Sequence, residues 1–149
     1  MNKLCGFALS AGIILCLLTG CSRAIEIDIA RQSSDINHCE IIFGTDLNTL
    51  KYENAILLQT GFIDTTNEQA PIPIAIVIIA KKEIILKLIR SNEVGNETRR
   101  LYENEDYKLN LTYKKQVEEH NEIIYKGNFS IENKGLKSEY NVTGCTCNL

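Results

Sequence analysis

A strict alternation of side chains over residues 107–114 constrains the fold of this chain more than any other feature. Every odd position of this stretch is apolar or aromatic, and every even position is polar. Successive side chains of a β-strand point to opposite faces of the sheet, so the pattern predicts a strand with one dry and one wet face. One strand cannot bury its apolar side chains alone, and the chain must therefore supply further strands.

Two more segments near the C-terminus show apolar residues on one face. They are residues 123–131, with Ile123, Tyr125, Phe129 and Ile131, and residues 136–142, with Leu136, Tyr140 and Val142. Asn133–Gly135 between them is a turn sequence, because glycine accepts a positive φ at little cost. The last third of the chain therefore predicts a three-strand antiparallel meander.

The middle of the chain predicts a second group of strands. Ile74–Ala80 is a continuous apolar run rich in β-branched residues, and a charged trio separates it from Ile84–Arg90. Two such runs are typical of a buried β-hairpin, followed here by a turn-rich tip at residues 91–96. Cys39–Phe43 is a further strand candidate. Residues 45–59 fit either a helix capped by Thr45 or Asp46 or a strand.

The expected fold is therefore all-β. We predict a small antiparallel β-sandwich or open barrel that contains the C-terminal three-strand meander and allows one short helix. A chain of 149 residues suits one domain rather than two. Lys and Arg number 16 against 19 Asp and Glu. This balance gives a net charge of -3, which argues against an electrostatic nucleic-acid partner.

The N-terminus has the features of a targeting sequence. A cationic start at Met1–Lys3 precedes an uncharged, mostly apolar stretch, Leu4–Leu18, and the run ends in Leu18-Thr19-Gly20-Cys21. The apolar stretch is shorter than the roughly 20 residues that a helix needs to cross a bilayer. A signal peptide, removed from the mature protein, is the better interpretation.

Residues 1–21 resemble the lipobox signal of bacterial lipoproteins. The resemblance implies cleavage between Gly20 and Cys21 and acylation of both the thiol and the new amino group of Cys21. Several acyl chains would hold the protein on a membrane essentially permanently. Residues 1–20 are then the signal peptide, 21–38 a lipidated N-terminus and polar tether, and 39–149 a single β-rich domain. Ile25, Ile27 and Ile29 alternate with Glu26 and Asp28, so part of the tether also fits an edge strand. Ser22, where Asp would retain the protein, resembles the pattern sent to the outer membrane of Gram-negative cells.

Three cysteines remain for the folded domain, Cys39, Cys145 and Cys147. An oxidising cell envelope favours a disulfide, and a Cys145–Cys147 ring would have poor geometry. We expect Cys39 to pair with Cys145 or Cys147. Such a link closes a loop of roughly 100 residues, which the chain-entropy model values at about 4.7 kcal/mol. The alternative is a metal- or thiol-handling site in which His38 joins the three thiols.

Other residues with reactive or charged side chains have ordinary structural interpretations. His120 lies in a polar connection, Arg99 and Arg100 fit a solvated strand end, and Glu103 with Glu105 lacks an apolar pocket that would shift a pKa. Four Asn-x-Ser/Thr triplets occur, at Asn96, Asn110, Asn128 and Asn141. Three of them fall at strand positions, and we interpret all four as chance products of the Asn, Ser and Thr content of wet strand faces. No phosphate loop, nucleophile elbow or zinc-protease motif occurs.

The sequence thus predicts a non-enzymatic envelope lipoprotein with no cofactor and no metal. Its small β-domain would bind a protein, cell-wall or small-ligand partner, and its lipid would bind the membrane. The alternative function is metal or thiol handling in the envelope through Cys39, Cys145 and Cys147.

Overall fold

The computed structural model describes residues 24–65, 70–119 and 121–147, and most of them belong to strands. In chain order the elements are β1 (His38–Gly44), α1 (Leu47–Tyr52), β2 (Leu58–Ile63), β3 (Ile72–Ile79), β4 (Lys82–Val94), β5 (Glu97–Glu103), β6 (Lys108–Glu119), β7 (Glu122–Asn133) and β8 (Leu136–Thr146). The prediction of an all-β antiparallel fold with one short helix is confirmed.

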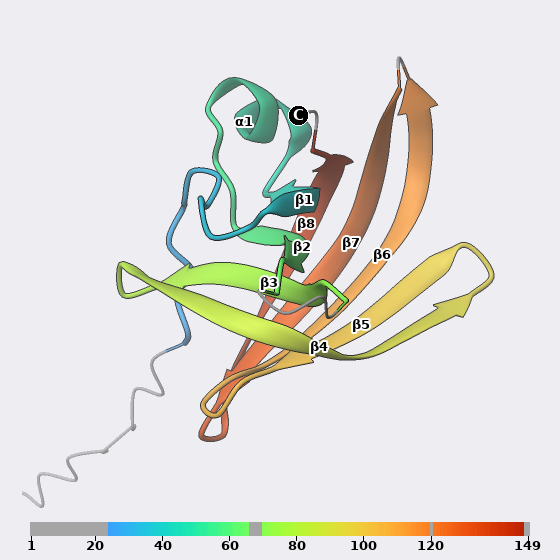
Figure 1. The fold of residues 1–149 in the computed structure, drawn as a ribbon. Coiled ribbons are helices and arrows are strands. Elements are labelled where there is room, and N and C mark those ends of the chain that lie inside the picture. The colour runs from blue at the N-terminus through green and yellow to red at the C-terminus, as the bar shows by residue number, and fades with distance from the viewer. Residues whose placement is uncertain (1–23, 66–69, 120, 148–149) are drawn as a thin grey trace, which may run out of the picture.

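The sheet closes on itself as an up-and-down barrel (Figure 1). Each strand pairs with the next one along the chain, and β8 returns to pair with β1 through Ile41–Gly44 and Thr143–Thr146. Of the two expected architectures the structure has the barrel, and the barrel is closed rather than open. Closure removes the unpaired edges that a sandwich of this size would leave.

The predicted strands are all present, and β2 and β5 are two further strands that the sequence did not assign. The Ile-rich hairpin forms β3 and β4, and the C-terminal meander forms β6, β7 and β8. Residues 97–103 form β5, which the sequence pattern did not assign to a strand. β5 joins the hairpin to the meander, since it pairs with β4 on one side and with β6 on the other.

Residues 45–59 take the helical one of the two alternatives that the sequence left open, and only Leu58 and Gln59 of this stretch belong to a strand. Asp46 caps α1, because its side chain accepts a hydrogen bond from the Thr49 amide at 3.0 Å. The helix ends at Tyr52, and β2 begins at Leu58. In α1 only Leu50 is buried, which lets this short helix cover the outside of the barrel.

Among the residues that the structure describes, inward side chains pack into one hydrophobic core inside the barrel. This core contains aromatic residues from four strands together with aliphatic residues from all around the sheet; these include Phe43, Leu58, Val77, Leu86, Tyr102, Leu111, Tyr113, Phe129 and Val142. Phe129 and Tyr140 stack with ring centroids 5.0 Å apart. An eight-stranded barrel is just wide enough for inward side chains to fill it, as they do here.

Residues 24–37, expected to belong to a polar tether, pack against the barrel instead. The Ile25 amide donates to Ser138 Oγ at 2.8 Å, and the Asp28 amide donates to the Ile78 carbonyl at 2.8 Å. Ile25 is buried in the core cluster. The segment then covers the outside of β2, where the Ser33 amide donates to Gln59 Oε1 at 2.9 Å. Of the alternating isoleucines, Ile25 and Ile27 pack against the core and account for this docking, whereas Ile29 is exposed.

We expect Ile25→Ala to destabilise the barrel by about 2–4 kcal/mol, because it leaves a cavity beneath the segment. Ile29→Ala is the matched control, since Ile29 is 68% exposed. The free energy of unfolding of this control should lie within about 0.5 kcal/mol of the wild-type value. Urea denaturation measures the free energy of unfolding of both variants. Equal stability of the two would show that Ile25 contributes no more than an exposed residue.

Candidate functional site

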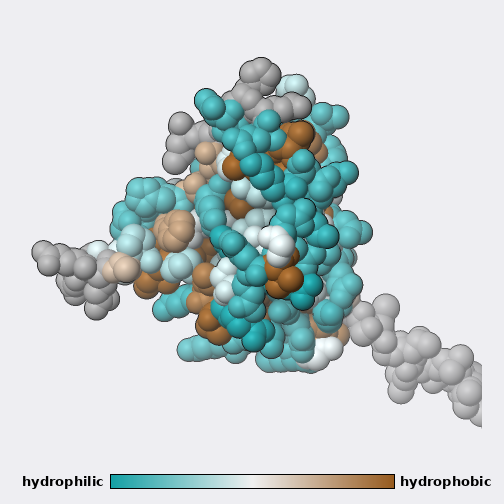
Figure 2. Space-filling model, turned by 90° about the vertical axis from the view of Figure 1, so that its right-hand side faces the viewer, coloured by the Kyte–Doolittle hydropathy of each residue, from teal (hydrophilic) through white to brown (hydrophobic). Residues whose placement is uncertain are grey.

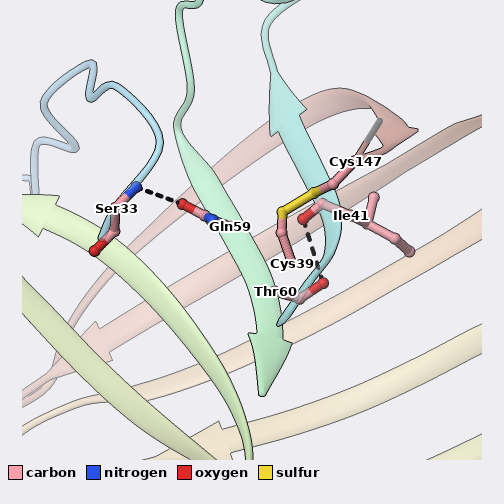
Figure 3. Close-up of a disulfide and its surroundings, with 6 residues drawn as sticks. All are labelled: Ser33, Cys39, Ile41, Gln59, Thr60 and Cys147. Atoms are coloured by element: carbon pink, nitrogen blue, oxygen red, sulfur yellow. Dashed lines mark hydrogen bonds between the residues drawn. A yellow bond between two sulfur atoms is a disulfide. The ribbon is translucent and has the colours of Figure 1, made fainter. Parts of the chain in front are cut away.

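The disulfide Cys39–Cys147 lies where the first and last strands meet (Figure 3). The two Cα atoms are 5.8 Å apart, and the bridge spans 108 residues of sequence. Beside it the Cys147 amide donates to the Glu40 carbonyl at 3.2 Å, which extends the β1–β8 pairing by one bond. Cys147 is thus the partner of Cys39 out of the two candidates, and the link reinforces the barrel closure.

Cys145 is left as a free thiol, buried on the outside of β8. It packs with Leu50 of α1 and with Ile56. Burial, with a smaller contribution from the Glu122 carboxylate, raises the pKa of the Cys145 thiol to about 11. A protonated, covered thiol is a poor nucleophile and a poor metal ligand at neutral pH.

The residues of the expected alternative metal site do not come together as a ligand set. His38 is exposed, and its Nε2 lies 3.4 Å from Asp64 Oδ1. Within residues 24–65, 70–119 and 121–147, no group of three or more His, Cys, Asp or Glu side chains could hold a metal ion. His120, the other histidine considered, lies outside the described residues.

The most distinctive polar contact inside the barrel joins Arg100 of β5 to Glu40 of β1. The Arg100 guanidinium donates Nη1 to Glu40 Oε2 at 2.5 Å and Nη2 to Oε1 at 2.7 Å, and its Cζ lies 5.6 Å from the centre of the Tyr113 ring. The Arg100 side chain is only 17% exposed. Burial of the guanidinium opposes its charge, but the hydrogen bonds that it donates to Glu40 outweigh this effect and hold the pKa of Arg100 above its usual value.

This ion pair crosses between strands that are not neighbours in the sheet. Its position on the barrel interior follows from the alternation in β5, where Tyr102 is buried and Arg100 points to the same side. The sequence analysis placed Arg100 at a solvated strand end, and the structure corrects that placement. The spacing Arg100-x-Tyr102, next to the strand candidate at residues 107–114, was the available signal, because residues two apart in a strand point to the same side. No local pattern indicated a partner for Glu40, because that partner is 60 residues away.

The remaining candidates lie on the surface. Arg99 points outward and pairs with Glu97 at 2.6 Å. Glu103 lies 3.6 Å from Lys108, and Glu105 is an exposed turn residue, so the two do not form a paired-carboxylate site. Asn110, Asn128 and Asn141 stand on the outer face of the sheet, because the residues next to them in each strand are buried in the core.

Comparison with known proteins adds no family assignment. No protein-family model, no curated protein and no solved structure matches this chain. Among the residues that the structure describes, no helix is long and apolar enough to span a membrane.

We expect Arg100→Met to destabilise the protein by about 2–4 kcal/mol, because Glu40 is then left partly buried without its partner. The double variant Glu40→Gln, Arg100→Met should recover much of this loss, since no unpaired charge remains. Chemical denaturation of the four proteins in the cycle measures the coupling. A double variant as unstable as the sum of the single variants would show that the two charges act independently.

If residues 1–20 are removed and Cys21 is acylated, as the sequence predicts, the mature protein should contain one titratable thiol, that of Cys145. We expect Ellman's reagent at pH 8 to react slowly with the folded protein, because the thiol of Cys145 is buried and protonated there, and to detect one thiol after unfolding. In the Cys145→Ser variant the reagent should detect no thiol. Three thiols, or a stoichiometric metal by elemental analysis, would instead support the metal- or thiol-handling alternative.

Proposed function

We propose that this protein is a non-enzymatic lipoprotein of the bacterial cell envelope, held on a membrane by acyl chains on Cys21. In Gram-negative cells the membrane would be the outer one. The barrel would be a binding module that meets a protein, cell-wall or small-ligand partner. The lipobox-like Leu18-Thr19-Gly20-Cys21 supplies the anchor in this proposal.

The observation that carries the proposal is the docking of residues 25–30 immediately after this motif. Four Cα–Cα steps separate Cys21 from buried Ile25, so the chain between them reaches at most about 14 Å. The docked segment meets the barrel near the β7–β8 and β3–β4 turns, where Ile25 bonds to Ser138 and the Lys81 amide donates to Asp28 Oδ2 at 2.8 Å. An acylated Cys21 would therefore hold this end of the barrel next to the bilayer.

The opposite end would then project away from the membrane. In Figure 1 the start of the described chain lies on the left, whereas the β4–β5 tip points right and the end of β6 and the start of β7 point up. The interior of the barrel is filled, which favours binding on its outer surface over binding inside it. A packed barrel on a short link suits a display role, because both its orientation and its distance from the membrane are restricted.

We expect the full chain, expressed in a bacterium, to partition into the detergent phase of Triton X-114. Its mature N-terminus should carry acyl chains by mass spectrometry, because a lipobox directs acylation of Cys21. Cys21→Ser should move the protein to the aqueous phase. Cys145→Ser is the control, since it removes a different cysteine and should leave partitioning unchanged. An unacylated wild-type protein with an intact N-terminus would contradict the proposal.

A further inference from the structure

We propose that a hollow on the outer face of β4, β5 and β6 binds an anionic glycan, a polysaccharide bearing carboxylate or phosphate groups. This inference names the ligand class of the proposed binding module, and it therefore rests on the proposed function. The hollow lies on the outside of the barrel, toward the β4–β5 hairpin tip. Its volume is about 210 Å³, which suits one charged sugar unit of a longer chain.

The sheet register explains how the hollow is built. One row across the three strands is Arg90, Leu101 and Asn110, and the next row toward the tip is Asn92, Arg99 and Thr112. These side chains point outward, because Tyr102 and Leu111, which alternate with them, are buried in the core. A register shift between Leu88 and Arg90 marks a bulge in β4 where the hollow begins, and bulges bend the strand that carries them.

The charge of the hollow is opposite to that of the chain as a whole. The protein has more acidic than basic residues, yet the outward residues that line the hollow include two arginines, Arg90 and Arg99, and no Asp or Glu. Arg100 also borders the hollow, but its side chain points into the barrel and pairs with Glu40. Arg99 donates Nε and Nη2 to Glu97 Oε1, whereas Arg90 makes no ion pair within the described part of the chain. Guanidinium groups bind carboxylates and phosphates through two parallel hydrogen bonds, so the hollow favours an anion.

Amide and hydroxyl side chains continue from the hollow across the sheet. Thr112 pairs with Asn128 of β7, and Asn128 pairs with Asn141 of β8, while Asn110 pairs with Ser130. Asn128 and Asn141 are exposed. Amides donate and accept hydrogen bonds at once, as sugar hydroxyls do, so this row is a polar track about two strand spacings long beyond the hollow.

This combination favours a glycan over an apolar partner. The side of the molecule with the β4–β5 tip is largely hydrophilic in Figure 2, and its apolar residues form separate patches. The lining of the hollow contains no aromatic ring on which a sugar could stack. Binding would therefore depend on charge and hydrogen bonds, and it should weaken as salt screens the arginines.

The test is equilibrium binding of the full chain, purified in a non-ionic detergent, by isothermal titration calorimetry. Oligogalacturonate is the carboxylated probe, phosphomannan the phosphorylated probe and dextran the neutral one. We expect at least one anionic glycan to bind at low salt, dextran not to bind, and affinity to fall as salt rises. Which anionic probe binds distinguishes carboxylate from phosphate recognition.

Arg90→Gln with Arg99→Gln should weaken anionic glycan binding about tenfold or more, because both guanidinium contacts are lost. The matched control is Arg31→Gln with Lys82→Gln, which removes the same charge from exposed residues elsewhere and should change affinity less than twofold. Asn128→Ala with Asn141→Ala should weaken binding of long chains about fivefold and leave a single charged sugar unaffected. Thermal unfolding checks that every variant folds.

Failure of any anionic glycan to bind, equal binding of dextran, or wild-type affinity in the Arg90, Arg99 double variant would overturn the inference. So would binding to phosphatidylglycerol vesicles, dependent on both arginines, without binding to either anionic glycan. Mass spectrometry of the same preparation reports the lipid on Cys21. A lipidated protein that binds no glycan contradicts this inference alone, and an unlipidated protein that binds glycan contradicts the anchor alone.

Discussion

The pairing of β1 with β8 is the contact on which the rest of the structure depends. It joins the first and last strands of the barrel through four residue pairs, and the Cys39–Cys147 disulfide and one further backbone bond lie at its end. Without this pairing two long strands would expose unpaired backbone groups, and the core would open along the seam. The disulfide lowers the entropy of the unfolded chain, and the effect is large because a link between the first and last strands closes a long loop.

Closure also determines where the protein can interact with other molecules. Inward positions of the strands are occupied by the hydrophobic core and by the Glu40–Arg100 pair, which spans from β1 to β5 inside the barrel. The outer face remains for recognition, and part of it is already covered by α1 and by residues 30–37. The uncovered outer face lies on β4 to β7 and on the part of β8 that α1 does not reach, which is also where the arginine-lined hollow and the amide track occur.

The sequence predicted those strands whose alternation or apolar content is strong, and missed the features that depend on distant partners. Residues 107–114 and Ile74–Ala80 were identified correctly because burial on one or both faces leaves a local pattern. β5 was missed because Arg99 and Arg100 stand side by side on opposite faces, and the inward arginine breaks the apolar pattern. Barrel closure, the choice of Cys147 over Cys145 and the partner of Glu40 all depend on register between distant strands, which no local pattern encodes.

The N-terminal segment shows how a polar composition can conceal a structural role. Its backbone, rather than its polar side chains, makes most of the contacts, through the amides of Ile25, Asp28 and Ala30. Two inward isoleucines are enough to fix such a segment, because they enter a core that the barrel has already formed. The segment therefore adds no free length between barrel and N-terminus. If Cys21 is acylated, the short link would keep the barrel upright on the membrane, and the β4–β5 hairpin beside the hollow would face away from the bilayer, toward extended polymers of the envelope.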